Sequence, residues 1–458
     1  MTLSPSSVPL VRAPAPSANL LVRQARVLDP REGIDGAHDV LVRDGVIAEI
    51  GLPGTIRAPD DAEIVEAAGR LLSPAFTDPH VHLRTPGQEH KEDLETGTRA
   101  AAAGGFCQVI GMPNTDPVID SAPILRSLRE TAARDARIPV GFVGSITVGL
   151  RGTALTVMAA LRRAGALGFS DDGRPIASAG MLRRALQYQR LTGAVLALHE
   201  EDFDLSAGGS MHEGQVSARL GIGGIPSISE SAIIARDVLV ARHEGGAIHL
   251  QHLSSSDSVL TVERAKQDGT RVTCEASPHH LCLTDEAVAG YDTSMKMNPP
   301  LRTEADRQAL IEGLRSGVID CVATDHAPHA RDEKEVPFEQ APMGTTGLET
   351  AFSALHTELV LPGVLELGLL IDRMTSGCGI FGLPIPRVAV GEAANLALID
   401  LEACWIVGEH GYESRSANCC FAGRRLQGRV LLTIADGVVA YRERGFAMSV
   451  APGPGRTV

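Results

Sequence analysis

The chain has 458 residues, of which 44% are hydrophobic and only 3% aromatic, so its core must be largely aliphatic. Such a length allows about two to four domains, although α/β barrels often exceed that rule as single units. The formal net charge is −14, which argues against a surface for nucleic acid or an anionic membrane, because both attract basic proteins. An anionic substrate would therefore need a local arginine or metal charge.

The first 18 residues, MTLSPSSVPLVRAPAPSA, are rich in proline, serine and alanine, and we expect them to form a disordered tail. They lack the basic start and apolar stretch of a signal peptide. No uninterrupted apolar run reaches the roughly 20 residues of a membrane-spanning helix. The eight cysteines show no Cys-x-x-Cys spacing. We therefore expect reduced thiols and a cytoplasmic protein that binds neither nucleic acid nor membrane.

Short strands and turns are predicted at both ends of the chain. Between residues 19 and 72, apolar and polar residues alternate in segments such as LLVRQARVLD, with DG and PG as turn signals. The same alternation of apolar and polar residues occurs over 388–458, in ANLALIDLE and GRVLLTIADGVVAYRE. Because chain termini often lie close together, the two pieces are expected to form one small composite β-sandwich.

The middle of the chain, residues 73–387, has a different pattern. Eight short apolar runs alternate with helical or loop sequence: 74–83, 105–114, 139–147, 166–173, 194–202, 246–254, 271–280 and 318–329. Strands that alternate with helices indicate parallel βαβ units. Eight such units predict a (β/α)₈ barrel of the α/β class.

Most of these runs end on His, Asp or Asn. In an α/β barrel the C-terminal ends of the strands form the active site, so side chains far apart in sequence would meet there. The polar residues at these ends are His80, His82, Asn114, Asp171, Asp172, His199, His252 and Asp325.

The pair His80 and His82 forms a His-x-His motif, whose two rings would point to the same side of a strand. Taken alone the motif is weak, because with fifteen histidines about half of one such pair is expected by chance. Four histidines and two carboxylates, from five strands, are much harder to place at matching strand ends by chance. Zinc binds His nitrogen and carboxylate oxygen, so the pattern predicts a metal site, and two zinc ions about 3.5–4 Å apart can share one carboxylate.

Longer motifs run from about residue 20 to the end of the chain, and they resemble those of the bacterial class I dihydroorotases, a branch of the amidohydrolase superfamily. They are FTDPHVHLRTPGQEHKED, GMPNTDPV, GFSDDG, CEASPHHL, KMNPPLR, ATDHAPH and MGTTGLETAF. The resemblance implies a barrel with a composite β-sandwich and two zinc ions per subunit, bridged by Asp172 and a hydroxide. It also implies reversible cyclisation of N-carbamoyl-L-aspartate to L-dihydroorotate in pyrimidine biosynthesis. A homodimer is expected from the family, and association with aspartate transcarbamoylase stays open.

The resemblance also assigns roles to single residues. His80 and His82 would bind the first zinc, His199 and His252 the second, and Asp325 would contact the first zinc and act as general base and acid. Adjacent strand residues point to opposite sides, so only one of Asp171 and Asp172 can face the metals. The family's Asp-Asp-Gly pattern selects Asp172. Substrate contacts are expected from Arg84, Asn114, Asn298, His329, Met343 and Gly344.

Several of these residues also have simpler structural interpretations. Asn114 fits a turn and Arg84 a surface charge. His249 lies three residues before His252, on the opposite face of its strand, so we do not expect it to bind metal. His279, His280 and His326 are expected to be structural or to support the ligands.

The distribution of lysine bears on the choice of reaction. Many relatives on this barrel bridge their metals with a carboxylated lysine on the fourth strand, but no lysine lies between Lys91 and Lys266. The bridge must then be a plain carboxylate, which disfavours hydantoinase, dihydropyrimidinase and allantoinase. A non-catalytic relative that serves as a structural partner of a transcarbamoylase is also disfavoured, because all six ligand positions are intact.

Two local features of the sequence are expected to affect the backbone near the site. Ala75 stands where the family usually has glycine, and Pro79, which has no backbone N–H, is expected to distort the first strand of the barrel. The Gly-rich segment 203–226 is expected to be irregular, either as a mobile loop over the site or as a plain surface loop.

Overall fold

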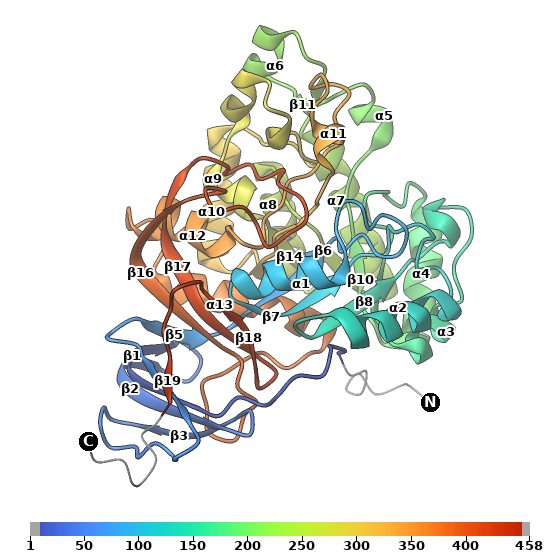
Figure 1. Ribbon diagram of the computed structural model, residues 1–458. Coiled ribbons are helices and arrows are strands. Elements are labelled where there is room, and N and C mark those ends of the chain that lie inside the picture. Colours follow the sequence, from blue (N-terminus) through green and yellow to red (C-terminus); the bar gives the residue numbers. More distant parts are fainter. Residues whose placement is uncertain (1–9, 451–458) are drawn as a thin grey trace.

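A nearly closed barrel of eight parallel strands forms the centre of the molecule (Figure 1). The computed structural model describes residues 10–450. The strands are β6 (Phe76–Val81), β7 (Phe106–Gly111), β8 (Val140–Gly144), β9 (Ala166–Ser170), β10 (Leu196–Leu198), β13 (Ala247–Leu250), β14 (Arg271–Ala276) and β15 (Cys321–Val322). They pair in chain order, and a parallel bridge between Val81 and His326 links the two ends of the series. The predicted eight-stranded barrel is confirmed.

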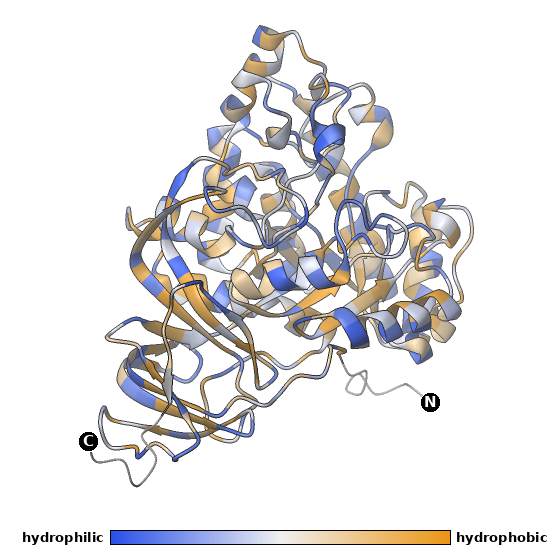
Figure 2. Ribbon diagram, viewed as in Figure 1, coloured by the Kyte–Doolittle hydropathy of each residue, from blue (hydrophilic) through white to orange (hydrophobic). Residues whose placement is uncertain are grey.

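Helices follow the strands and cover the outside of the barrel. The longer ones are α1 (Leu94–Ala103), α2 (Ala122–Asp135), α3 (Met158–Ala164), α4 (Ala179–Thr192), α7 (Ile228–Glu244), α8 (Ser256–Gln267), α10 (Glu304–Ser316) and α13 (Leu367–Thr375). The short ones are α5 (Phe203–Ser206), α6 (Gln215–Leu220), α9 (Pro278–Cys282), α11 (Arg331–Lys334) and α12 (Ala351–Leu355). The barrel strands are mainly apolar, whereas the helices alternate apolar and polar residues, as amphipathic outer helices do (Figure 2).

Local sequence explains where these elements begin and bend. Helix α1 begins after Asp93, whose carboxylate accepts a hydrogen bond from the backbone N–H of Thr96 at 2.8 Å and so caps the helix. In β6, the pairing with β7 shifts register between Asp78 and Val81, a stretch that contains Pro79. The irregularity expected from this proline is therefore present.

A second sheet of nine strands combines both ends of the chain. Its members are β1 (Leu20–Asp29), β2 (Ile34–Arg43), β3 (Val46–Gly51), β4 (Glu63–Glu66), β5 (Leu71–Pro74), β16 (Leu396–Ile406), β17 (Arg425–Ala435), β18 (Val438–Arg442) and β19 (Ser449–Val450). The strands β5 and β16 pair antiparallel and join the two parts. Apolar side chains from both parts, among them Val27 and Leu432, share one core. The predicted composite β domain is confirmed.

The expected disordered tail is wrong for residues 10–18, whereas residues 1–9 lie outside the described part of the chain. Val11 exchanges two backbone hydrogen bonds with Val140 at the start of β8, at 3.1 and 2.9 Å. The guanidinium of Arg12 pairs with Asp436 at 3.0 Å, next to β17. The proline-rich composition did not reveal this segment, because pairing with a distant strand satisfies its backbone groups.

The segment 203–226 is more ordered than its glycine content suggests. Besides α5 and α6 it contains β11 (Met211–His212) and β12 (Gly224–Ile225), which pair in parallel. The segment projects beyond the barrel at the top of Figure 1. The guanidinium of Arg302 donates a 2.8 Å hydrogen bond to the carbonyl of Ile225, which attaches the segment to the body of the protein.

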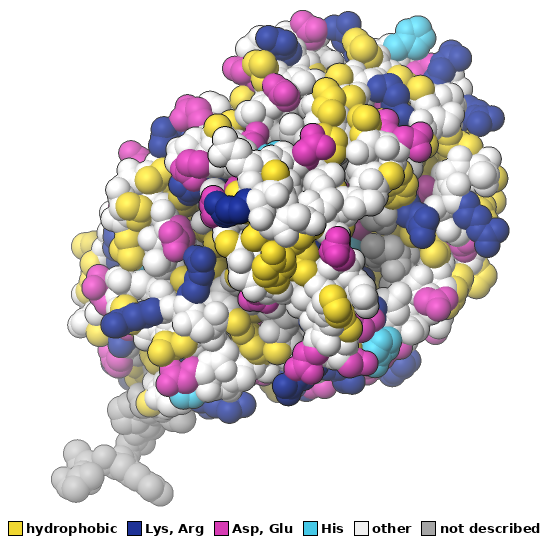
Figure 3. All heavy atoms as spheres, turned by 90° about the horizontal axis from the view of Figure 1, so that it is seen from above, with side chains coloured by type: hydrophobic (Ala, Val, Ile, Leu, Met, Phe, Trp, Pro, Cys, Tyr) yellow, Lys and Arg dark blue, Asp and Glu magenta, His cyan; other side chains and the backbone are white. Residues whose placement is uncertain are grey.

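On the face seen from above in Figure 3, acidic and basic side chains are interspersed rather than gathered by sign. The eight cysteines are free thiols, and Cys107, Cys274 and Cys321 are buried. Among residues 10–450, no helix combines the length and the apolar character that crossing a bilayer would require.

Two Asp-Gly turns press against each other between β2 and β3 and between β17 and β18. Gly437 has a φ of 73°, and a Cβ there would lie 2.6 Å from the carbonyl oxygen of Gly45. We expect Gly437→Ala to lower the free energy of unfolding, measured by urea denaturation, because it adds both an unfavourable φ and a backbone clash.

The matched control is Gly423→Ala, since Gly423 has the same φ of 73° and no atom within 4 Å of the added Cβ. We expect Gly437→Ala to cost about 1–3 kcal/mol more than this control. Equal losses for the two variants would show that the contact between the turns adds nothing.

Candidate functional site

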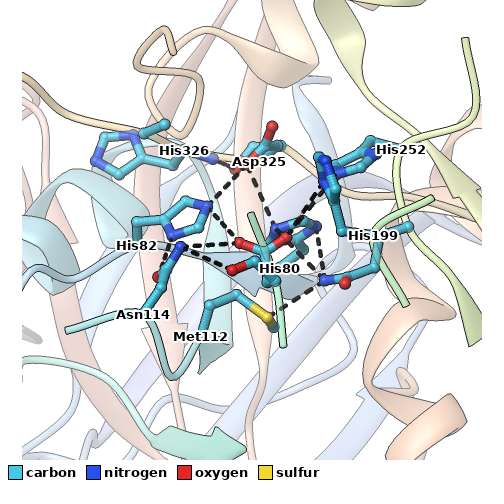
Figure 4. A network of polar contacts seen from close by, with 12 residues as sticks. His80, His82, Met112, Asn114, His199, His252, Asp325 and His326 are labelled. Atoms are coloured by element: carbon cyan, nitrogen blue, oxygen red, sulfur yellow. Dashed lines mark hydrogen bonds and ion pairs between the residues drawn. The ribbon is translucent and has the colours of Figure 1, made fainter. Parts of the chain in front are cut away.

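The C-terminal ends of five barrel strands bring together the six residues expected to bind metal (Figure 4). All six residues are buried, with exposed fractions of 8% or less. The residues fall into two groups of candidate ligands that share one aspartate. The first group is His80, His82 and Asp172, and the second group is Asp172, His199 and His252.

Asp325 lies beside the first group. Its Oδ1 is 3.0 Å from Nε2 of His82 and 3.4 Å from Nε2 of His80. The carboxylate of Asp172 faces the same two nitrogens, at 3.4 Å from His80 and 3.5 Å from His82. Two carboxylates therefore converge on the nitrogens of the His-x-His pair.

In the second group, two imidazole nitrogens point toward each other. Nδ1 of His199 lies 2.9 Å from Nε2 of His252, and these atoms lie 3.9 and 3.8 Å from Oδ1 of Asp172. Two nitrogens bound tetrahedrally to one zinc ion would lie about 3.3 Å apart. The observed spacing is close to that value, so the pair suits a common cation.

Hydrogen bonds on the far side of the rings fix which nitrogen faces the cluster. In His80, Nδ1 donates to Oε1 of Glu275 at 2.6 Å. In His82, Nδ1 donates to Oδ1 of Asn114 at 2.9 Å, and in His199, Nε2 donates to Oε2 of Glu201 at 3.1 Å. Metal-bound histidines usually show such a second partner, which leaves the other nitrogen free to bind the ion. The free imidazole nitrogens and the carboxylate of Asp172 are therefore suited to bind metal ions.

Glu275 and Glu201 were not singled out in the sequence. Glu275 is fully buried and also accepts hydrogen bonds from His249 Nε2 at 3.0 Å and from the backbone N–H of His252 at 3.2 Å. A glutamate inside the apolar run RVTCEA was the available signal, because a buried carboxylate needs partners. His249 itself contacts Thr273 and Glu275, and it belongs to neither ligand group.

The charges of the cluster also favour a cation. Burial by itself lowers the pKa of His80, but the carboxylates of Asp172, Asp325 and Glu275 outweigh burial and raise that pKa well above its usual range. Burial raises the pKa of Glu275, yet the facing imidazoles of His80 and His249 hold it at about 2. The negative charge that these shifts reveal would equally stabilise a bound metal ion.

The two neighbouring aspartates point in different directions. Asp171 accepts hydrogen bonds from the backbone N–H groups of Ile146 and Thr147, at 2.8 and 2.9 Å. Asp172 belongs to both ligand groups. The alternation argument allowed only one of the pair to face the cluster, and in this structure it is Asp172.

Arg84 is a buried cation close to the cluster. Only 9% of Arg84 is exposed, and its Nε donates to the carbonyl of Pro328 at 3.1 Å. The interpretation of Arg84 as a surface charge is therefore wrong. Burial lowers the pKa of Arg84 to about 10, against the opposing effect of Asp325 and Asp172. The guanidinium therefore remains charged at neutral pH.

The two asparagines contact the ligand cluster. The amide of Asn114 donates to Oδ2 of Asp172 at 3.1 Å while its carbonyl holds His82. The amide of Asn298 donates to Oε2 of Glu201 at 2.8 Å and lies 3.5 Å from Nε2 of His199. Both asparagines are thus at the site, in positions that also orient the histidines.

His329 lies against the segment that contains Met343 and Gly344. Burial, with the charges of Arg84 and Lys334, lowers the pKa of His329 to about 3, so the ring is neutral at pH 7. Its Nε2 is 2.8 Å from the carbonyl oxygen of Met343. A carbonyl only accepts, so the single ring proton lies on Nε2.

Three further histidines lie outside the two ligand groups. His326 points away from the cluster (Figure 4), and its Nε2 lies 3.3 Å from the buried carboxylate of Glu92. Nε2 of His280 donates to the carbonyl of Pro299 at 2.9 Å. Nε2 of His279 is buried and has no hydrogen-bond partner in the described part of the chain.

The two sequence comparisons with known proteins agree on one family. A sequence profile described as "Dihydro-orotase-like" matches residues 69–258. The dihydroorotase of Geobacter sp. (strain M21) is 44% identical over 425 residues, which cover 93% of this chain and 99% of that protein. The dihydroorotase of Anaeromyxobacter dehalogenans (strain 2CP-C) is 44% identical over 427 residues, with 93% and 98% covered.

Solved structures with the same fold carry different names. The L-hydantoinase (dihydropyrimidinase) of Arthrobacter aurescens has a TM-score of 0.83 at 24% identity and covers 95% of this chain and 99% of its own. The dihydropyrimidinase of Brevibacillus agri NCHU1002 has a TM-score of 0.80 at 22% identity, with 95% and 97% covered. At this identity the likeness shows the barrel fold alone.

The orientation of the two aspartates leads to a prediction about metal content. We expect Asp172→Asn to lose at least one equivalent of metal per subunit, because the substitution removes the carboxylate shared by both groups. Asp171→Asn is the matched control and should retain the metal of the wild type. Metal analysis of both purified proteins decides, and the reverse pattern would assign the shared ligand to Asp171.

The contact between Glu275 and His80 leads to a second prediction. Glu275→Gln keeps the size of the side chain but removes its negative charge. We expect metal affinity to fall about 10- to 100-fold, as for other partners of ligating histidines, in titrations with a competing chelator. An affinity equal to that of the wild type would mean that Asp172 and Asp325 alone set the charge of the site.

Proposed function

The chain belongs to the dihydroorotase family, and we propose that it catalyses the reversible, zinc-dependent interconversion of N-carbamoyl-L-aspartate and L-dihydroorotate in the cytoplasm. The observation that carries the proposal is the sharing of Asp172 by two buried ligand groups, beside Asp325 and the buried cation of Arg84. A plain carboxylate in the shared position also separates this site from lysine-bridged relatives.

The protein's ligands suit two metal ions. His80 and His82 would hold the first, His199 and His252 the second, and Asp172 would bridge both. Zinc ions bound there would supply a water activated near neutral pH and would polarise the carbonyl of the substrate. The hydrogen bonds that three of the rings donate to Glu275, Asn114 and Glu201 keep those rings in the required tautomer.

Substrate binding would depend on Arg84. Its guanidinium is charged and desolvated, so it can bind the substrate carboxylate through two N–H groups. Asn114, Asn298 and His329 would line the same space, and Met343 and Gly344 would contribute backbone groups. A net charge of −14 makes a local cation necessary for an anionic substrate.

Asp325 would move the proton. During hydrolysis it accepts a proton from the attacking water and gives it to the ring nitrogen as the carbon–nitrogen bond breaks. In cyclisation the ureido nitrogen would attack the carbon of the side-chain carboxylate and lose a proton to Asp325, which would pass it to the departing oxygen as the carbon–oxygen bond breaks, so that water leaves. Asp325 has a φ of 47°, a conformation that non-glycine residues rarely adopt and that often occurs at functional sites.

Dihydroorotate hydrolysis by the purified protein tests the proposal. We expect Asp325→Ala to lower kcat about 10²- to 10⁴-fold, because it removes the general base, while most of the metal is retained. The exposed Asp332 provides a control, and Asp332→Ala should have wild-type activity.

The same assay with dihydrouracil, hydantoin and allantoin tests the rival reactions. If dihydroorotate is inert and another ring opens, the proposed substrate is wrong. A homodimer and an association with aspartate transcarbamoylase belong to the same proposal, and light scattering of the protein alone and with that enzyme tests them.

A further inference from the structure

Asn418 lies at the barrel mouth although it comes from the part of the chain that forms the β domain. It belongs to a hook segment, residues 412–420, in the connection between β16 and β17. In Figure 1 this red connection passes in front of the barrel. Only 6% of Asn418 is exposed, so its amide must find partners within the protein.

The side chain of Asn418 joins two segments of the barrel. Its Oδ1 accepts a hydrogen bond from the backbone N–H of His329 at 3.0 Å. Its Nδ2 donates to the carbonyl oxygens of Ala327 and Gly344, both at 3.1 Å. One amide thereby connects residues 327–329 to residue 344, and both of its donor hydrogens have an acceptor.

The backbone of Asn418 adds to this connection. Its carbonyl oxygen accepts from the N–H of Thr346 at 3.0 Å and from the hydroxyl of Thr345 at 3.1 Å. The two barrel segments therefore contact the same residue through five hydrogen bonds. Both segments carry expected substrate contacts, in His329 and in Met343–Gly344.

The two segments are also packed without spare room. A Cβ on Gly344 would lie 2.8 Å from Cβ of Ala327 and 3.0 Å from Nε2 of His329. The same nitrogen is 2.8 Å from the carbonyl oxygen of Met343. A shift of either segment would therefore change the position of the His329 ring.

The hook segment is attached to the barrel independently of Asn418. The hydroxyl of Ser416 donates to the carbonyl of Lys91 at 2.6 Å, and the backbone N–H of Arg415 donates to Glu92 at 3.1 Å. Changing the Asn418 side chain should thus leave the segment docked. The effect of such a change can then be separated from loss of the whole segment.

We propose that Asn418 is a positioning residue that fixes the distance between the substrate-contact segments 327–329 and 343–344. This inference rests on the proposed function, because it assumes that both segments contact the substrate. Within residues 10–450 the Asn418 side chain bonds only to backbone groups of residues 327, 329 and 344 and to none of the candidate metal ligands; it acts through the backbone of its neighbours.

The test compares three variants of the full-length, metal-loaded protein. Asn418→Asp keeps the size and one acceptor oxygen but places a carboxylate oxygen against the carbonyls of Ala327 and Gly344. Asn418→Ala removes all three side-chain hydrogen bonds. Ser416→Ala is the control within the hook segment, since it removes the bond to Lys91 and none to the substrate-contact segments.

For dihydroorotate hydrolysis we expect both Asn418 variants to raise KM about 10- to 100-fold, with kcat changed less than about threefold and metal content unchanged. Ser416→Ala should keep the KM of the wild type. Wild-type KM in a folded, metal-loaded Asn418 variant would overturn the proposal, as would a lower kcat with unchanged KM. If Asn418→Ala does not fold, Asn418→Asp decides.

Hydrogen exchange provides a readout that does not depend on activity. We expect peptides covering 327–347 to exchange faster in the Asn418 variants than in the wild type and in Ser416→Ala. If the wild type does not hydrolyse dihydroorotate, the proposed function fails, and exchange alone then decides the positioning role. Unchanged exchange in that region would overturn it.

Discussion

The hydrogen bond between Glu275 and His80, 2.6 Å long and fully buried, determines how the rest of the site can be arranged. A carboxylate without water needs positive or donating partners. Glu275 obtains them from three directions, at His80, His249 and the backbone of His252. These contacts turn the first ring toward Asp172 and hold the strand end that carries a ligand of the second group, so one buried charge sets the geometry of both groups.

The fold was predictable because a strand covered on both faces appears in the sequence as a continuous apolar run. Each of the eight runs contains one barrel strand, but several strands are shorter than their runs. The run 246–254 yields β13 only over Ala247–Leu250, and 318–329 yields β15 only over Cys321–Val322. His252 and Asp325 have positive φ values of 33° and 47°, which turn the chain out of the ladder just where the polar side chains are needed.

The six candidate ligands could be predicted because they share a place in the strand pattern, whereas their supporting residues could not. Glu275 lies 195 positions from His80 in sequence, and nothing local marks the pair. The choice between Asp171 and Asp172 likewise depends on backbone groups at 146–147, more than twenty residues away. Contacts of this kind are set by how the loops pack, and periodicity carries no information about them.

Because of the hook segment, the barrel and the β domain are not independent units. Division by strand pattern ends the barrel at residue 387 and assigns everything after it to the β domain, yet residues 414–418 contact Glu92, Lys91 and the loop that carries His329. A barrel cut free at that boundary would keep all six candidate ligands but lose the residues that hold the loop carrying His329. The small domain is therefore part of the active unit, and the two could not be exchanged between relatives as separate pieces without matching this contact.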